Sequence, residues 1–305
     1  MNSDNEELII DKLNEIINLI KNTSFTEKSI ISEKFVAPII VPEKPKQTEF
    51  EYLRKLLHSE EWPAAVSSFL ICGEDDEEKI ERAENVLDLI SFDLQNKKLL
   101  DFGCGEGHVA LKSVQELTNK SIGYDIIKTG NLNWEEENQN CLLTINFDKV
   151  TQYAPYDYII LYDVLDHSRE PLKILEAVKS LSNSNTKIFV RCHPWTGRHA
   201  IHQYKVLNKA FVHLVFDELE LEQLNINFDH GFIKKDFYPI KNNNELFEKL
   251  GLKVNSHDTI SNKVEEFFKK NDVISKRIKK HYDSDEFPDW QLSQIFNDYV
   301  LTIDN

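Results

Sequence analysis

The sequence predicts an α/β fold in which a doubly wound, mostly parallel sheet of seven strands follows an N-terminal helical extension. Three observations predict it. Apolar runs of strand length alternate with helical periodicity from residue 98 onward. The first run ends in a glycine-rich turn, and a carboxylate follows that turn by about 20 residues.

The first 97 residues form the predicted extension. Residues 1–22 contain apolar side chains at three- and four-residue steps, which predicts one amphipathic helix. This helix either docks on its own domain or associates with a second copy or a partner. Residues 23–48 contain three prolines and no periodic pattern, which predicts a linker. Residues 49–97 predict a helical segment leading into the core, with one of its helices starting at Trp62.

The core is predicted to span residues 98–305. Its expected strands are 98–102, 121–124, 141–147, 158–162, 187–192, 252–256 and 299–303. Helices are expected between them at 107–118, 171–181 and 245–250. Two insertions exceed what a minimal domain needs, at about 193–241, with helices at 202–214 and 219–224, and at 262–285, a basic amphipathic helix pair. The first insertion leaves the carboxyl end of a strand, where ligands bind in α/β sheets, so we expect it to select the substrate.

Three glycines stand at alternate positions in the turn after the first strand: Gly103, Gly105 and Gly107. Glycine permits positive φ and lets the backbone approach a ligand at a helix N-terminus. A dinucleotide fingerprint would need a glycine where His108 stands, so the spacing disfavours a nicotinamide-dependent oxidoreductase. Asp101 would repel a pyrophosphate but suits a cationic ligand such as an ammonium group.

The D-x-G-x-G-x-G pattern from Asp101 to Gly107 resembles motif I of the class I S-adenosylmethionine (SAM) dependent methyltransferases. The resemblance covers residues 98–192 well and the last strands loosely, and it implies a seven-stranded sheet whose last strand inserts antiparallel. It also implies SAM as cofactor. Asp125 ends the second strand, where a carboxylate can accept both ribose hydroxyls. We expect a cofactor-binding set of Asp101, Gly103, Cys104, Gly105, Gly107, Asp125, Ile126, Phe147, Asp148 and Asp163.

Roles for the last three of these residues come from the resemblance. It implies that Asp148 takes the adenine amino group, that Phe147 packs on the adenine ring, and that Asp163 faces the methionine part of the cofactor. Polar, aromatic and glycine residues follow the fifth strand, and we expect the groups that bind the methyl acceptor to converge at this strand end. After the fourth strand the sequence lacks Asn-Pro-Pro-Tyr, which argues against amino-methylation of adenine or glutamine. It also lacks Pro-Cys there, which argues against methylation of cytosine at C5.

Candidate catalytic residues are the histidines near these strand ends, because histidine transfers protons near neutral pH: His193, His199 and His167. Arg191 or Arg198 could clamp an anionic substrate group. A metal is conceivable on His193, His199 and His202. We expect none, because no carboxylate or thiolate stands at ligand spacing with them, Cys192 pointing away from His193.

Composition limits the kinds of substrate and the cellular location that we expect for this chain. The formal net charge of -16 disfavours a nucleic-acid substrate, although basic residues at 276–281 could contact phosphates. Four scattered cysteines, no signal peptide and no membrane-length apolar run predict a soluble, cytoplasmic protein. We therefore expect an enzyme that methylates oxygen or nitrogen on a small molecule or protein. The alternatives are an RNA cap-type methyltransferase and a non-catalytic, methyltransferase-like protein tethered by its N-terminal helix.

Overall fold

The computed structural model describes residues 47–66, 75–116, 118–168, 170–194, 197–198, 200, 207–226, 243–261, 265–281 and 294–304. The chain divides into two units, Met1–Lys34 and Phe35–Asn305. All described residues belong to the second unit. The predicted helix within residues 1–22, and the linker apart from its last two residues, lie outside the described part.

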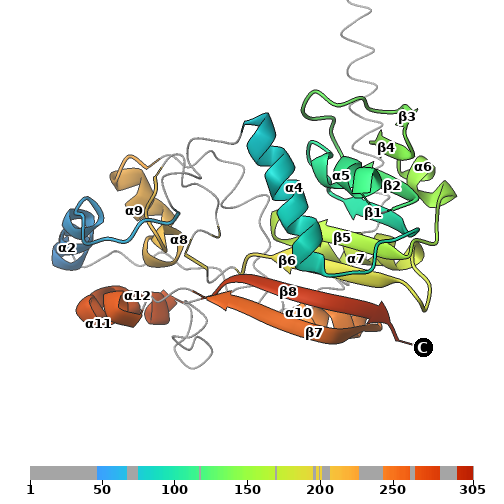
Figure 1. Cartoon of the computed structure of the whole chain (residues 1–305). Coiled ribbons are helices and arrows are strands. Elements are labelled where there is room, and N and C mark those ends of the chain that lie inside the picture. The colour runs from blue at the N-terminus through green and yellow to red at the C-terminus, as the bar shows by residue number, and fades with distance from the viewer. Residues whose placement is uncertain are drawn as a thin grey trace, which may run out of the picture. The chain divides into compact units, whose positions relative to one another are not determined.

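One mixed sheet has the strand order β3-β4-β2-β1-β5-β6-β8-β7 (Figure 1). Its parallel strands are β1 (Lys98–Phe102), β2 (Lys120–Tyr124), β4 (Cys141–Thr144), β5 (Tyr158–Tyr162) and β6 (Lys187–Cys192). The last strand, β8 (Gln294–Ile303), inserts antiparallel between β6 and β7 (Leu252–Ser261). The predicted α/β fold is confirmed. One strand was not predicted, the two-residue edge strand β3 (Glu137–Asn138).

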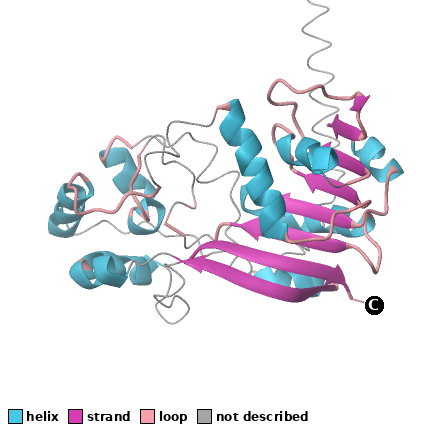
Figure 2. Cartoon of the chain, in the orientation of Figure 1, coloured by secondary structure: helices cyan, strands magenta, loops and turns pink. Residues whose placement is uncertain are grey.

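The sheet is buried because its central strands are apolar runs, as parallel strands covered on both faces are. Helix α4 (Asp76–Ile90) packs Val86, Leu87 and Ile90 against side chains of β1, β5 and β6. Its start is fixed by a capping box between Asp75 and Glu78, which satisfies two backbone N–H groups. The other helices around the sheet are α5 (His108–Glu116), α6 (Phe147–Gln152), the 3₁₀ helix η2 (Leu165–His167), α7 (Pro171–Ser180) and α10 (Asn243–Lys249), and Figure 2 shows how helices and strands alternate.

Three predicted elements differ from the structure. The third predicted strand, 141–147, ends at Thr144, because the Asn146 side chain accepts a hydrogen bond from the amide of Asp148 and caps α6. No helix starts at Trp62, and residues 207–211 are not helical. These two stretches bond to each other instead. The indole of Trp62 donates to the carbonyl of Ala210 at 2.8 Å, and the Asn208 side chain bonds both backbone groups of Val66.

A second hydrophobic core joins three segments that are far apart in the sequence, and we call it the helical core. They are residues 47–66, 207–226 and 265–281, which contain α2 (Gln47–Leu57), α8 (Val212–Val215), α9 (Glu218–Gln223), α11 (Glu265–Lys270) and α12 (Asp272–His281). Sequence reasoning treated the lead-in and the two insertions as separate. Among the described residues, the apolar side chains of each segment pack in one cluster with those of the other two.

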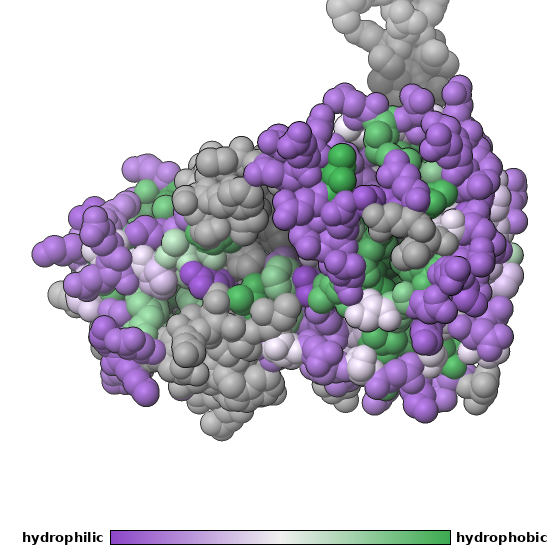
Figure 3. Space-filling view, viewed as in Figure 1, coloured by the Kyte–Doolittle hydropathy of each residue, from purple (hydrophilic) through white to green (hydrophobic). Residues whose placement is uncertain are grey.

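A buried ion pair ties the helical core together. The guanidinium of Arg277 on α12 donates to the carboxylate of Glu220 on α9 and to the carbonyl of Val215. Glu220 is fully buried and also accepts the amide of Asp217 in a capping box. Arg277 therefore points inward and does not belong to the basic surface that residues 276–281 suggested. Most of the described surface in Figure 3 is hydrophilic. No helix among the described residues is long and apolar enough to cross a membrane.

Candidate active site

The turn between β1 and α5 depends on its three glycines for different reasons. All have positive φ: +78° at Gly103, +55° at Gly105 and +88° at Gly107. A Cβ on Gly103 would lie 2.5 Å from Val164 Cγ2, and one on Gly107 would lie 2.6 Å from Leu143 Cδ1. A Cβ on Gly105 would meet nothing within 4 Å. The first and third glycines thus permit close packing, whereas the middle glycine faces open space that a ligand can enter.

Asp125 connects the end of β2 to this turn. Its Oδ2 accepts a hydrogen bond from the amide of Gly105 at 2.8 Å, and its Oδ1 accepts from the amide of Ile126 at 2.7 Å. The side chain is half-buried, and each carboxylate oxygen has a second lone pair. The carboxylate can therefore hold the turn and still accept hydrogen bonds from a ligand's hydroxyl groups.

Asp101 lies beneath the turn, at the fourth position of β1. Its side chain is buried, and its Oδ2 has no hydrogen-bond partner. Burial, and next the charge of Asp125, raises the pKa of Asp101 to about 7, while Arg82 lowers it. A cation arriving at this edge would stabilise the ionised form.

The ends of β2 and β4 are adjacent, because Tyr124 pairs with Thr144. Phe147 starts α6, and its ring centroid lies 5.6 Å from that of Tyr124. Asp148 is exposed in the first turn of α6, and Ile126 is 78% exposed. Four members of the predicted cofactor set, Asp125, Ile126, Phe147 and Asp148, thus lie at two neighbouring strand ends.

Cys104 contributes to the turn through its backbone. Its amide donates to the carbonyl of Tyr124 at 3.0 Å, and its Sγ would lie 3.0 Å from a Cβ on Gly123. Burial raises the pKa of the Cys104 thiol, so it is not a reactive thiolate.

A second group of polar side chains lies where β5 and β6 end. Asp163 has φ +55°, and its amide donates to the carbonyl of Arg191 at 2.9 Å. Its Oδ1 lies 3.6 Å from Nε2 of His193. The amide of His193 donates to Oδ2 of Asp166 at 3.2 Å. Sequence reasoning named Asp163 and His193 for different roles. It noted Asp166 only as a loop residue, because nothing in local spacing shows that His193 joins the two carboxylates.

Arg191 is not available to clamp a substrate. It makes a buried bidentate ion pair with Asp298 on β8, with both nitrogen–oxygen distances at 2.6 Å, and it donates to the hydroxyl of Tyr162 at 3.1 Å. The guanidinium of Arg198 donates to the carbonyl of Ala64. Both arginines proposed as anion clamps therefore make contacts within the chain.

The three candidate catalytic histidines differ in position. His193 is buried at the β6 end beside Asp163. His167 is exposed at the end of η2. His199 lies outside the described residues. Among the described residues, then, only His193 combines the strand-end position with a neighbouring carboxylate.

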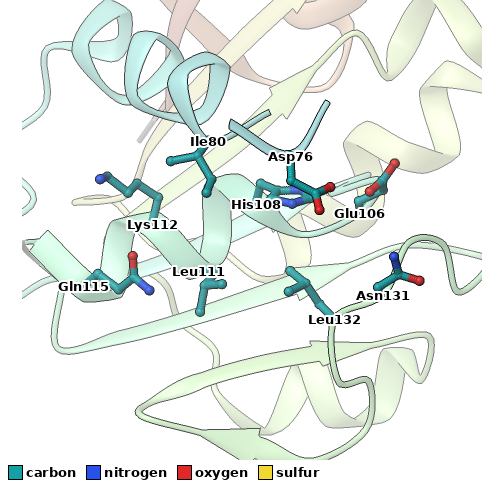
Figure 4. Close-up of a pocket in the computed structure, with 9 residues that line it drawn as sticks. All are labelled: Asp76, Ile80, Glu106, His108, Leu111, Lys112, Gln115, Asn131 and Leu132. Atoms are coloured by element: carbon teal, nitrogen blue, oxygen red, sulfur yellow. The ribbon is translucent and has the colours of Figure 1, made fainter. Parts of the chain in front are cut away.

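A pocket of about 250 Å³ lies elsewhere, on α4, α5 and the loop after β2 (Figure 4). Glu106 and His108 line it, together with Ile80, Leu111 and Leu132 among others. None of the predicted cofactor residues lines it. The strand-end groups described above, and not this pocket, therefore form the candidate site.

A family model described as "Methyltransferase domain" matches residues 76–257, which is more than half of the chain. The chain belongs to this family of methyltransferase domains. The match runs from the first residue of α4 through β6 and into β7. The family expected from the glycine turn and the strand order is thus confirmed. A comparison with curated proteins gave no match.

Solved structures resemble this methyltransferase only distantly. Coclaurine N-methyltransferase bound to N-methylheliamine and SAH is 12% identical, with 88% of this chain and 84% of that chain covered and a TM-score of 0.44. Magnesium protoporphyrin IX methyltransferase from Synechocystis PCC 6803 with bound SAH is 11% identical, with 84% and 95% covered and a TM-score of 0.40. The cyclopropane synthase MmaA2 from Mycobacterium tuberculosis is 11% identical, with 84% and 94% covered and a TM-score of 0.45. These values are too low to indicate which acceptor this methyltransferase uses.

Proposed function

We propose that this methyltransferase moves a methyl group from SAM to an oxygen or nitrogen acceptor on a small molecule or a protein. One observation carries the proposal. The amide of Gly105, the middle glycine of the Gly103–Gly107 turn, donates a hydrogen bond to Oδ2 of Asp125 at 2.8 Å. The same glycine faces open space at the carboxyl end of the sheet. Binding of a pyrophosphate group is disfavoured at this turn, because two carboxylates, Asp101 and Asp125, lie beside it.

The described residues fit the cofactor. The open space over Gly105 leaves room for the amino-acid part of SAM. Oδ2 of Asp101, which has no hydrogen-bond partner among the described residues, suits the ammonium group of SAM. Asp125 has lone pairs left for two ribose hydroxyls. Phe147, Asp148 and Ile126 flank the position of the adenine. When bound, SAM supplies an activated methyl group on a sulfonium, so the chain's main task is to align the acceptor with it.

Acceptor recognition is assigned to the ends of β5 and β6. Val164 packs against Gly103, so the loop that carries Asp163 and Asp166 lies directly beside the cofactor turn. His193 reaches the same place from β6. Its Nδ1 lies 3.0 Å from the carbonyl of Ile295, and Nε2 faces Asp163. Nε2 can either take up a proton from the acceptor or bind a cation. These two roles of His193 would require different kinds of acceptor.

The insertion after β6 is proposed to select the acceptor together with the rest of the helical core. It starts close to His193, and the carbonyl of Arg198 accepts the amide of Phe211 at 2.9 Å. RNA is the weaker alternative, because Arg277 is buried against Glu220 and Lys276 pairs with Asp272 on the same helix. Two of the basic residues that could have contacted phosphates thus have partners within the chain.

The test is a calorimetric titration of the full chain with SAM and, separately, with NADH. We expect micromolar SAM binding by the wild type and no binding by Gly105→Arg, whose side chain would fill the open space over the turn. Gln95→Arg adds the same charge at an exposed position outside the site and should bind normally. Failure of the wild type to bind SAM, or a preference for NADH, would overturn the proposal. A folded wild type that binds neither ligand would favour the non-catalytic alternative.

A further inference from the structure

Asp163, Asp166 and His193 form a compact set of ligand-type atoms. One atom from each residue can be chosen so that all three lie within 4.8 Å of one another. Asp163 and Asp166 come from the segment after β5, and His193 follows β6. Two carboxylates and one imidazole are ligands that divalent transition metals accept together.

The hydrogen bond on the far side of the His193 ring determines what its near side offers. Nδ1 lies 3.0 Å from the carbonyl oxygen of Ile295, which can only accept, so Nδ1 carries the proton. In the neutral ring Nε2 then has a lone pair, and it faces Oδ1 of Asp163 at 3.6 Å. Two acceptors therefore point at each other, beyond hydrogen-bond distance. Oδ1 of Asp163 is buried and has no hydrogen-bond partner. An electrophile between the two atoms would accept an electron pair from each.

The charged groups around Asp163 also favour a bound cation. Asp166 and Asp298 repel the carboxylate of Asp163, whereas Arg82 and Arg191, the latter already in a bidentate pair with Asp298, attract it. Asp163 also has φ +55°, a conformation that costs energy and is often retained at functional sites.

We propose that Asp163, Asp166 and His193 bind one divalent cation of the manganese(II) type. A first-row cation holds carboxylate oxygens and imidazole nitrogens at about 2.0–2.2 Å, so two ligand atoms on one ion lie roughly 3–4 Å apart. The 3.6 Å between His193 Nε2 and Asp163 Oδ1 falls in this range. The bond from Nδ1 to a backbone carbonyl is the outer contact by which metal-binding histidines are commonly oriented.

The cation also narrows the acceptor, an inference that rests on the proposed methyl transfer. Three protein ligands leave coordination positions open, and hard oxygen donors suit such a cation. The acceptor would then be a hydroxyl, whose pKa the cation lowers. As the oxygen attacks, the new O–C bond forms, the C–S bond of the donor breaks, sulfur keeps the electron pair and the hydroxyl proton passes to water. His193 acts here as a ligand and not as the base.

The experiment titrates the full, metal-free chain with Mn²⁺ alone and follows binding by calorimetry and by the loss of the free-ion EPR signal. We expect one ion per chain with a dissociation constant in the micromolar range. Asp163→Asn and His193→Asn should each weaken binding at least tenfold. Asn tolerates the left-handed backbone at position 163. At position 193, the Asn amide can still donate to the Ile295 carbonyl while Nε2 is lost. Asp88→Asn removes an equal charge at an exposed position of α4 and should bind as the wild type does.

Two results would overturn the cation site: no binding of Mn²⁺ by the wild type up to millimolar concentrations, or binding that both site variants leave unchanged. Parallel SAM titrations in a chelator separate this inference from the proposed function. SAM binding without Mn²⁺ binding would reject the cation and keep the methyltransferase, whereas Mn²⁺ binding without SAM binding would do the reverse. Melting temperatures of both variants within a few degrees of the wild type show that the comparison is made on folded protein.

Discussion

The amide of Gly105 donates to Oδ2 of Asp125 at 2.8 Å, although 20 positions separate the two residues in the chain. This bond joins the glycine turn after β1 to the end of β2. Both features are separate motifs in the sequence, and each would be compatible with several nucleotide cofactors by itself. Joined in this way, they make one surface in which the carboxylate holds the turn and keeps lone pairs for further hydrogen bonds.

Asp125→Asn should weaken SAM binding at least tenfold, because the amide side chain replaces one of the two acceptor oxygens now bonded by Gly105 and Ile126. The measurement is SAM calorimetry together with the melting temperature. Asp157→Asn is the matched control, since Oδ2 of Asp157 accepts the amide of Lys98 at 2.8 Å at the start of β1. It should lower stability by a comparable amount without changing SAM affinity. Equal loss of SAM affinity in both variants would contradict a binding role for Asp125.

Gly103→Ala should destabilise the chain, because its Cβ would lie 2.5 Å from Val164 Cγ2 and φ is +78°. We expect a loss on the order of 2–4 kcal/mol, measured by denaturant unfolding, from overpacking and backbone strain together. Val164→Ala in the same chain should restore the steric part and leave about 1–2 kcal/mol of strain. A double variant no more stable than Gly103→Ala would show that Val164 is not what the methyl group meets.

Asp101 should make the stability of the ligand-free chain depend on pH. Its pKa is raised to about 7 in the folded state, against about 4 in the unfolded state. The folded chain therefore holds the proton longer, so the contribution of Asp101 is fully present below pH 4 and is lost as the pH rises through 7. Relative to wild type, Asp101→Asn should gain on the order of 2–4 kcal/mol between pH 5 and pH 8. Unfolding curves at these pH values measure it, and a difference that does not change with pH would contradict it.

The same carboxyl should make SAM affinity depend on pH. An ammonium group binds the ionised form of Asp101, so the affinity should rise with pH and level off above 7. In Asp101→Asn the affinity should be lower and almost independent of pH over this range. Calorimetry in buffers of different ionisation enthalpy also counts the protons released on binding. Wild-type binding below pH 7 should release one proton, and the variant should release none.

Removal of the Arg277 guanidinium should open the helical core. Arg277→Met leaves the fully buried carboxylate of Glu220 without its charged partner, which costs about 3–5 kcal/mol. Lys276→Met, one position earlier on α12 with a side chain that is 74% exposed, should change stability by less than about 0.5 kcal/mol. Adding Glu220→Gln to Arg277→Met should recover part of the loss in denaturant unfolding. Equal effects of the two single substitutions would place Arg277 at the surface.

Local sequence was sufficient to predict the sheet and one half of the candidate site, the half at the ends of β1 and β2. Strands β1, β5 and β6 contain short apolar runs, and the Gly103–Gly107 turn and Asp125 directly follow β1 and β2. Such signals are local because the period of side chains along a strand, and the positive φ that favours glycine, are properties of a few consecutive residues. The sequence therefore determined the family and the fold, and it predicts which edge of the sheet binds the cofactor.

Only the tertiary structure decided which distant residues share a site or a core. His193 lies against Asp163 because β5 and β6 are neighbours, and Arg191 pairs with Asp298 instead of a substrate because β8 returns from the far end of the chain to lie beside β6. Trp62 lies in no helix, since its indole and the following backbone bond to residues 208–210. These contacts span from 30 to 148 positions, and their energy comes from burial and pairing that no local periodicity records.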